Sequence, residues 1–408
     1  MRSLAWILIA VILLAPSPAP AADSAFQNFL QALWPQAQAY GIARATFDAA
    51  MRGLEPDFSL PDLIIPGQPE RAEPGQAEFV QTPADYLKET SFRRLAAQGK
   101  KLSDEHRTTL AAIERQFGVP GNVVLAIWGR ETSFGGYKLP HDAIRVLATQ
   151  AYVGRRKDIF RIELLAALRM LQDGTPRAKM RSSWGGAMGM TQFLPSEFYK
   201  YAVDFDGDGR ADIWTSAPDA LASAAKQLAG KGWQRGKGWA YEVRVPDNFD
   251  CTTANPDNLM PLGEWLERGY APAHGRALTA EELTDPASLL QPAGIYGPAF
   301  LILKNYYVIK DYNFSDLYVL FVGHLAERIA SAPAFEKPWS PVVQLHTQAL
   351  EEMQRRLTSL GLYRDKIDGK AGMRTRLALG AYQKVNGLRL DCWPTAAVLA
   401  HMQGKAGN

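Results

Sequence analysis

Residues 123–132 read VVLAIWGRET, an apolar run that ends in a single acid, Glu131. The run predicts a buried helix, and the following TSFGG closes it with an aromatic residue and two glycines. A carboxylate at the end of such a helix either pairs with a cation, for example Arg130, or acts as a general acid. Apolar neighbours such as Trp128 and Phe134 would raise its pKa and favour the second use.

The composition indicates a globular protein. The chain has 408 residues, of which 47% are hydrophobic and 21% charged, which is typical of roughly two or three domains. The formal net charge of +3 is too small to indicate nucleic acid or a membrane surface as a partner. We therefore expect no nucleic-acid function.

The N-terminus has the pattern of a secretory signal peptide. Arg2 precedes an apolar run over residues 4–15, and small residues lead to a cleavage position near Ala21. The run is shorter than the about 20 apolar residues that a transmembrane helix needs. We therefore expect residues 1–21 to be removed, with no transmembrane anchor.

The remaining chain predicts a mainly α protein. Apolar residues recur at helical spacing in most segments, and no long alternating pattern indicates a strand. We expect a large helical domain followed by a proline-containing linker and a small three-helix module. The predicted boundaries are 22–330 for the helical domain (with a proline-rich extended segment at 52–83), 331–341 for the linker and 342–408 for the module, whose helices fall near 344–360, 374–387 and 394–403.

The two cysteines, Cys251 and Cys392, lie far apart in the sequence and fall in different predicted domains. A disulfide between them is possible in a secreted protein. We nevertheless expect two free, mostly buried thiols.

A second segment, SSWGGAMGMTQFLP at 182–195, combines small residues with one amide, Gln192. Glycine and alanine let another chain or a sugar ring approach the backbone closely. The Gln192 amide can donate to and accept from sugar hydroxyls. Tight packing between helices is the alternative use of the small residues.

With further motifs, these two segments resemble the lytic murein transglycosylases, specifically the B-type family with an α+β, lysozyme-like catalytic domain. The resemblance covers most of residues 76–330. Its motifs are QAEF at 76–79, GVP at 118–120, Glu131-Thr132 with Gly135, SxxGAMGxxQFxPS from Ser183, YAVDFDGDGRADIW at 201–214 and NYYVIKDYNFSDLYVLFVGHLAERI at 305–329.

The resemblance implies a periplasmic enzyme that cuts the β-1,4 bond between MurNAc and GlcNAc in peptidoglycan glycan strands. It implies that Glu131 is the catalytic acid and base, and that the substrate cleft is lined by Ser183, Met190, Gln192, Tyr152, Tyr312, Asn313 and Tyr318. One departure is Gln227, where family members often have a tyrosine that could stack on a sugar.

One carboxylate suffices for the implied reaction, although most glycosidases need two. Glu131 would donate a proton to the glycosidic oxygen and then take one from the C6 hydroxyl of the same sugar, closing a 1,6-anhydro ring. A hydrolytic muramidase, which needs a second carboxylate, and a non-catalytic wall-binding protein are the alternatives.

The sequence DFDGDGRAD also predicts a metal site. Oxygen donors recur at every second position and glycine stands at the sixth, as in the front half of an EF-hand calcium loop. The positions concerned are Asp204, Asp206, Asp208 and Arg210. We expect a structural Ca²⁺ ion and no organic cofactor.

The end of this loop departs from the EF-hand pattern, because the twelfth position is Thr215 instead of glutamate. Asp219 would supply the missing carboxylate in the longer loop that the family resemblance implies. Alternatively, Asp219 is the third residue of a helix whose N-cap is Ser216.

The C-terminal module resembles the small three-helix peptidoglycan-binding domain. The resemblance rests on positions such as Gln354, Leu357, Asp368-Gly369, Thr375 and Tyr382-Gln383. These are mostly turn and core positions, so a purely structural role is the alternative. A later Asp-Gly turn of that family appears here as Asp391-Cys392.

Overall fold

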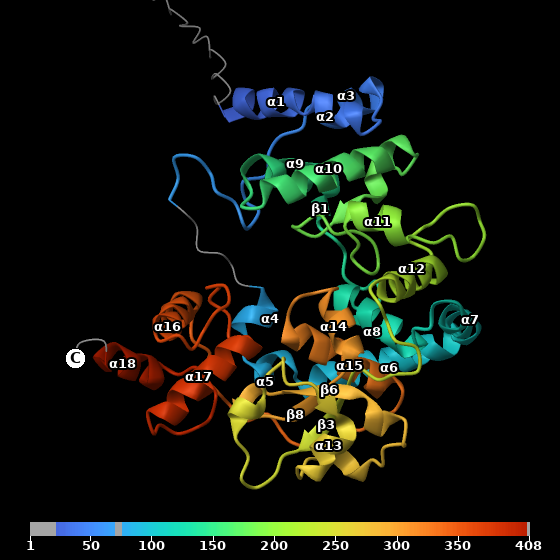
Figure 1. Ribbon diagram of the computed structural model, residues 1–408. Coiled ribbons are helices and arrows are strands. Elements are labelled where there is room, and N and C mark those ends of the chain that lie inside the picture. Colours follow the sequence, from blue (N-terminus) through green and yellow to red (C-terminus); the bar gives the residue numbers. More distant parts are fainter. Residues whose placement is uncertain (1–21, 70–75, 406–408) are drawn as a thin grey trace, which may run out of the picture.

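Two helix-rich lobes and a C-terminal module make up the part of the chain that the computed structural model describes, residues 22–69 and 76–405 (Figure 1). The signal peptide predicted over residues 1–21, with its cleavage near Ala21, lies outside these residues. Within them, no helix is both long and apolar enough to cross a membrane.

The upper lobe in Figure 1 packs the N-terminal helices against a helical hairpin. Its core contains Phe26, Leu30, Phe47, Leu147 and Leu164, all with no exposed side-chain surface. The helices of this lobe are α1 (Ala22–Ala32), α2 (Trp34–Ala39), α3 (Arg44–Met51), α9 (Ala143–Val153), α10 (Lys157–Gln172) and α11 (Pro195–Tyr201). Beside them lie the two-stranded sheet of β1 (His141–Asp142) with β2 (Arg181–Ser182) and the 3₁₀ turn η1 (Arg177–Lys179).

The lower lobe is built around one central helix, α8 (Gly121–Thr132). Residues 123–129 of this helix are buried on every side, as expected for a helix that is apolar all round. Gly129 lets the ring of Phe134 pack directly against the helix backbone, because a Cβ at this position would lie 2.6 Å from that ring. The surrounding helices are α4 (Ala77–Val80), α5 (Pro83–Tyr86), α6 (Glu89–Glu105), α7 (Arg107–Phe117), α12 (Ala217–Gly230), α14 (Lys304–Lys310) and α15 (Asp316–Ile329).

A five-stranded antiparallel sheet lies on the side of the lower lobe that faces away from the upper lobe (Figure 1), in a region where the sequence indicated no strands. The strand order is β4-β6-β8-β3-β5. The strands are β3 (Ala240–Arg244), β4 (Met260–Pro261), β5 (Ala271–Pro272), β6 (Pro286–Leu290) and β8 (Ala299–Ile302), with β7 (Pro292–Ile295), α13 (Leu262–Glu267) and the 3₁₀ turns η2 (Cys251–Thr253), η3 (Ala273–Gly275) and η4 (Glu282–Thr284) beside them. Since β6 and β8 are buried on both faces, they lack the alternation that marks a half-buried strand.

The C-terminal module contains the three predicted helices, α16 (Thr347–Ser359), α17 (Met373–Val385) and α18 (Ala396–Lys405). Its core is formed by residues such as Met353, Leu357 and Leu379. The mainly α class with a small helical module is confirmed.

The segment predicted as a linker, residues 331–341, packs on the lower lobe. The Phe335 ring stacks on His324 with 3.7 Å between centroids. The backbone N–H groups of Glu336 and Lys337 donate to the carboxylate of Glu242, each at 3.0 Å. This segment therefore holds the module close to the lower lobe.

The expectation of two free thiols was wrong, because Cys251 and Cys392 form a disulfide. It joins η2 in the lower lobe to the segment that precedes α18. Both cysteines are buried. The two cysteines are 141 residues apart in the sequence, so local sequence patterns give no sign that their segments lie side by side in the fold.

Candidate functional site

Glu131 lies in the last turn of α8, in a partly buried position. The Tyr318 hydroxyl of α15 donates a hydrogen bond of 2.5 Å to Oε1 of Glu131. Burial raises the pKa of the Glu131 carboxyl, and the negative charge of Glu78 raises it further. The Tyr318 hydrogen bond and the charge of Arg130 oppose this effect, but the burial is larger and the pKa is raised overall.

Arg130 has partners other than Glu131. Its Nε and Nη2 atoms donate to the Tyr86 hydroxyl at 2.9 and 2.5 Å. Its ion pair is with Glu78, at 3.9 Å between Nη2 and Oε2. The guanidinium also lies over the rings of Tyr86, Tyr318 and Phe321. The simple salt bridge considered for Glu131 is therefore not the arrangement adopted.

Two tyrosines stand together beside Glu131. The rings of Tyr312 and Tyr318 are nearly parallel, at 8°, with 6.5 Å between centroids. The Tyr312 hydroxyl donates to the Thr191 carbonyl at 2.5 Å. Burial, together with the charge of Glu131, holds the pKa of both phenols well above the ordinary value. Both hydroxyls therefore remain protonated donors.

The segment 182–195 is attached directly to α8. The Thr132 hydroxyl donates to the Met190 carbonyl at 2.8 Å, and the Met190 N–H donates to the Ile213 carbonyl at 2.9 Å. The Met190 side chain packs against the core of the lower lobe. Met190, one of the residues predicted to line the cleft, is thus joined through its backbone to the helix that carries Glu131.

Gln192 and Ser183 occupy tight turns of this segment. Gln192 has a φ of 57°, a left-handed conformation that is strained for a residue with a side chain and is common at functional sites. Its Nε2 donates to the Gly189 carbonyl at 3.0 Å. The Ser183 Oγ accepts a hydrogen bond from the Ala187 N–H at 3.3 Å. Both side chains are partly exposed.

The small residues of the segment also serve close packing. Gly186 has a φ of 82°, and a Cβ there would lie 2.3 Å from the side chain of Leu147. Gly189 has a φ of 75°, and a Cβ there would lie 2.8 Å from the Ile213 carbonyl. At these two positions the small residues serve tight packing, the alternative to substrate approach, although the packing is between a loop and its neighbours instead of between two helices.

Asn313 is held by Glu78, an acid to which the sequence assigned no role. Its Nδ2 donates to Glu78 Oε1 at 3.0 Å, and its Oδ1 accepts from the Ser315 N–H at 3.2 Å. Glu78 and Tyr86 are thus neighbours of the site to which the sequence assigned no role, and Arg130, expected only as a partner of Glu131, contacts both of them. The QAEF motif contained the signal for Glu78, although nothing in that motif gives the residue a role.

Tyr152 and Gln227 are placed differently from the group around Glu131. The Tyr152 ring packs against Phe26 and Phe29 of α1, with centroids at 5.3 and 5.1 Å, in the upper lobe. Gln227 is buried, and its Nε2 donates to Glu197 Oε2 at 3.0 Å. Gln227 therefore faces α11 and presents no stacking surface.

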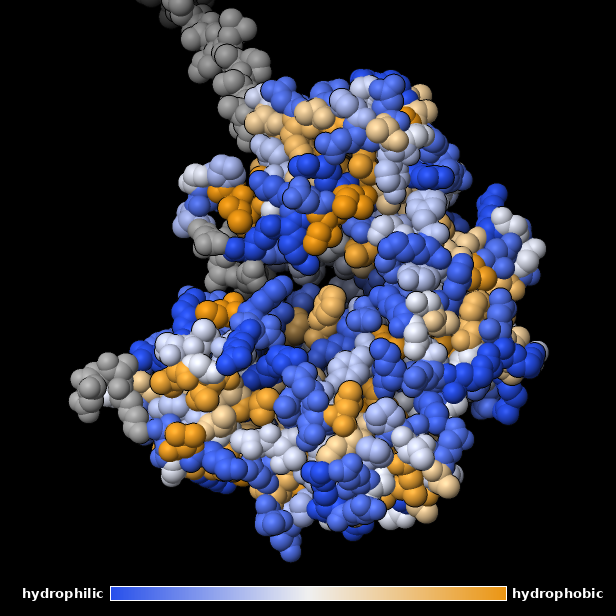
Figure 2. All heavy atoms as spheres, viewed as in Figure 1, coloured by the Kyte–Doolittle hydropathy of each residue, from blue (hydrophilic) through white to orange (hydrophobic). Residues whose placement is uncertain are grey.

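The surface is hollowed between the upper and lower lobes (Figure 2). A separate cavity of about 410 Å³ lies between the lower lobe and the C-terminal module. Its lining includes Glu78, Phe314 and Arg374 but not Glu131. Since Glu78 also faces Arg130, it forms part of the wall between this cavity and the surroundings of Glu131.

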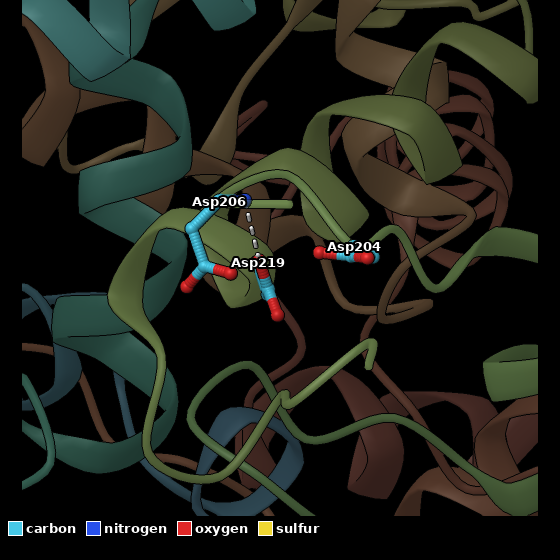
Figure 3. Close-up of side chains that lie close together, drawn as sticks. All are labelled: Asp204, Asp206 and Asp219. Carbon is cyan, nitrogen blue, oxygen red and sulfur yellow. Dashed lines mark hydrogen bonds between the residues drawn. The ribbon is translucent and has the colours of Figure 1, made fainter. Parts of the chain in front are cut away.

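The predicted metal loop brings three carboxylates together. One oxygen each of Asp204, Asp206 and Asp219 lie within 4.8 Å of one another, and Figure 3 shows the three side chains converging from the loop and from the start of α12. Such oxygen donors suit a hard cation such as Ca²⁺. Asp208 lies outside this group, with its Oδ1 accepting from the Arg210 N–H at 2.9 Å.

Asp219 lies in the first turn of α12 and also borders the metal loop. Its N–H donates to the Ser216 Oγ at 3.3 Å, which is the N-cap contact. Its buried carboxylate accepts from the N–H groups of Phe205, Asp206 and Asp212 at 2.8, 3.2 and 2.8 Å. The carboxylate therefore organises the loop and also faces the cluster.

Comparisons with known proteins cover both parts of the chain. The family model of the transglycosylase SLT domain matches residues 25–327, and that of a putative peptidoglycan binding domain matches residues 346–402. Membrane-bound lytic murein transglycosylase B of Escherichia coli (strain K12) is 31% identical over 222 residues, which are 53% of this chain and 58% of that protein. The chain thus spans little more than half the length of this relative.

Solved structures give a more extended match. SltB3 of Pseudomonas aeruginosa, in complex with NAG-NAM-pentapeptide, superposes with a TM-score of 0.81 and is 38% identical, covering 92% of this chain and 99% of its own. The Escherichia coli lytic transglycosylase Slt35, in complex with calcium, has a TM-score of 0.51 and is 26% identical, covering 62% of this chain and 80% of its own.

Proposed function

Because this chain belongs to the transglycosylase SLT domain family, we propose that it is a peptidoglycan lytic transglycosylase. It cleaves the β-1,4 bond between MurNAc and GlcNAc without water and leaves a 1,6-anhydroMurNAc end. The observation that carries this proposal is the partly buried Glu131 carboxyl, whose pKa is raised and which accepts a hydrogen bond from Tyr318. The likeness to SltB3, solved with a NAG-NAM-pentapeptide, supports the substrate class.

Glu131 acts first as an acid and then as a base. In its protonated form it donates to the glycosidic oxygen as the bond from that oxygen to C1 breaks, and the N-acetyl carbonyl oxygen of the sugar stabilises the cationic C1. The C6 hydroxyl then attacks C1, and its proton passes to the Glu131 carboxylate. The proton that was donated is recovered, so the step consumes no water and needs no second carboxylate.

The neighbours of Glu131 determine which of its oxygens reacts. Since the Tyr318 hydroxyl donates to Oε1, Oε2 is the oxygen that carries and transfers the proton. Tyr312 stacks beside Tyr318 and closes the same side of the site. The remaining residues proposed to contact the glycan strand are Ser183, Met190, Gln192, Asn313 and, on the upper-lobe side, Tyr152.

The predicted loop is proposed to hold a structural Ca²⁺ ion. The convergence of Asp204, Asp206 and Asp219 supports this, as does the likeness to Slt35, whose structure was solved in complex with calcium. Asp208 and Arg210 complete the ligand set that the EF-hand spacing implies. The ion would fix the loop that connects α11 to α12 and takes no part in the reaction.

The location of the enzyme and the role of its C-terminal module follow from the substrate. Peptidoglycan is outside the cytoplasmic membrane, so the enzyme acts in the periplasm after export by the segment 1–21. The C-terminal module, which matches a putative peptidoglycan binding domain, contributes binding to the glycan strands. Cell fractionation followed by detection of the mature N-terminus tests the location and the export.

Mass spectrometry of digested sacculi tests the activity. The proposal requires 1,6-anhydromuramoyl ends with no ¹⁸O incorporated from labelled water. Reducing ends that carry ¹⁸O would instead identify a hydrolytic muramidase, and the absence of any cleavage would identify a binding protein. Glu78, the acid that pairs with Arg130, is already committed to Asn313 and Arg130, which disfavours it as the second carboxylate of a hydrolase.

A further inference from the structure

Glu78 is an acid in a short helix, α4, whose side chain is only 9% exposed. Each of its carboxylate oxygens has a different partner. Oε1 accepts the hydrogen bond from the Asn313 amide at 3.0 Å, and Oε2 lies 3.9 Å from Arg130 Nη2. The Glu78 backbone carbonyl also accepts from the Ser315 hydroxyl at 3.2 Å. One residue therefore holds both the 313–315 turn and the cation beside Glu131.

Arg130 needs such a counter-charge. Its side chain is 29% exposed, and its guanidinium lies 5.1 Å from the centroid of the Tyr86 ring and 5.9 Å from that of Tyr318. An uncompensated cation at this place would favour the ionised form of the neighbouring Glu131, since an opposite charge stabilises a carboxylate. A protonated Glu131 is what the first step of the proposed reaction requires.

The charged and titratable groups around Glu131 and its immediate neighbours come from several elements. Arg130 belongs to the same helix, Glu78 to α4, Tyr318 to α15 and Tyr312 to the turn before α15. From the junction of α6 and α7, His106 faces the Trp128 ring, at 6.5 Å between centroids. Glu197 of α11 acts on Tyr312, and Tyr86 of α5 accepts the hydrogen bonds of Arg130.

We propose that Glu78 is a positioning residue for the proposed reaction. It balances the charge of Arg130 so that Glu131 keeps its proton, and it fixes Asn313 at the edge of the site. This inference rests on the proposed function, because it assigns Glu78 a task only if Glu131 must begin the reaction protonated. The negative charge of Glu78 also acts directly on Glu131 in the same direction.

The test is the pH profile of the purified full chain acting on soluble glycan fragments. Glu78→Gln keeps the shape and a hydrogen-bond acceptor for Asn313 but removes the charge. We expect the high-pH limb of the rate to move to lower pH by about one unit, within the range seen when a nearby charge changes. Glu78→Asp keeps the charge and should leave the limb within a few tenths of a unit of its wild-type position. Glu351→Gln, the same change in α16 of the C-terminal module, is the matched control and should change nothing.

Arg130→Gln provides an independent test with the opposite sign. Removing the cation should move the limb to higher pH, and the double variant Glu78→Gln with Arg130→Gln should return it towards the wild-type position. A lower rate for Glu78→Gln with an unmoved limb would overturn the proposal and leave Glu78 a structural residue. If Glu78→Gln does not fold, the proposal is decided by Arg130→Gln alone, and an unmoved limb there overturns it.

The reaction products distinguish a failure of the role proposed for Glu78 from a failure of the proposed function. Variants that still release 1,6-anhydro ends while their limb stays fixed refute the role of Glu78 alone. A wild-type enzyme that releases no anhydro ends refutes the proposed function, whatever the behaviour of the variants.

Discussion

The Tyr318 hydroxyl donates to Oε1 of Glu131 at 2.5 Å, although 187 positions separate the two residues in the chain. This contact joins the end of α8 to the first turns of α15. Because burial keeps the phenol protonated, the tyrosine is a permanent donor and the carboxyl has one free oxygen. The geometry of the acid is thus determined by a residue from α15, the last helix of the lower lobe in the sequence.

Replacing Tyr318 by phenylalanine should change both the rate and its pH dependence. The hydrogen bond lowers the pKa of Glu131, so its loss should raise that pKa and move the high-pH limb of activity to higher pH. The rate at the optimum should fall by about tenfold or more, because a buried carboxylate oxygen loses its partner, at a cost of about 1–3 kcal/mol. Tyr363→Phe in the C-terminal module is the control. A limb that moves to lower pH would contradict the assigned hydrogen bond.

Glu131→Gln should remove the reaction without removing the fold. General acid–base catalysis contributes about 10²–10⁴ to a rate, and here one residue performs both halves, so the loss should lie at or beyond the top of this range. Release of anhydro products from glycan fragments measures the rate, and pull-down on glycan should show retained binding. Glu114→Gln, an exposed site on α7, is the matched control. Near-normal turnover of Glu131→Gln would show that the acid is another residue.

Calcium should stabilise the protein without being needed for the reaction. Binding only the native state adds about 2.7 kcal/mol to the free energy of unfolding at a hundredfold excess of ion over Kd. Chelation with EDTA, or Asp206→Ala combined with Asp208→Ala, should lower the Tm while activity persists below the new transition. Asp158→Ala, an almost fully exposed acid on α10, should have no effect. An unchanged Tm after chelation of protein shown to carry calcium would exclude the site.

The disulfide should stabilise the docked arrangement of the C-terminal module. Replacing Cys251 and Cys392 by serine removes a cross-link over 141 residues, for which the chain-entropy model gives about 5 kcal/mol. We expect a lower Tm but retained activity on soluble fragments, since the buried ion pair of Arg376 with Asp316 at 3.1 Å still joins the module to α15. The wild type in reductant should show the same shift, and the serine variant none. A Tm that reductant leaves unchanged in the wild type would contradict a stabilising role.

The helix that carries Glu131 was predictable because its apolar run is continuous and its end is marked by glycines. The raised pKa followed from burial, which the composition of residues 123–134 already indicates. The charge balance around it was not predictable, because Glu78 reaches Arg130 from a separate short helix 52 positions earlier. Hydrophobic periodicity depends only on the spacing of nearby residues, so it cannot identify an electrostatic partner from a distant segment.

The sheet and the disulfide escaped prediction for related reasons. The strands β6 and β8 are short and buried on both faces, so their apolar runs resemble fragments of buried helix. Cys251 and Cys392 meet only because α17 packs beside η2, where Lys384 also pairs with Asp250 at 2.6 Å. Such a contact depends on the tertiary arrangement and not on either local sequence.

The bond between Cys251 and Cys392 closes residues 251–392 into a covalent loop. Tyr312, Asn313 and Tyr318 belong to the segment within this loop, whereas Glu131 belongs to the chain that precedes it. A protease that cuts once within the loop, for example beside the exposed Phe314 or Val385, therefore releases no fragment. The nicked enzyme remains one molecule of unchanged mass apart from one added water, and it separates into two pieces only after reduction.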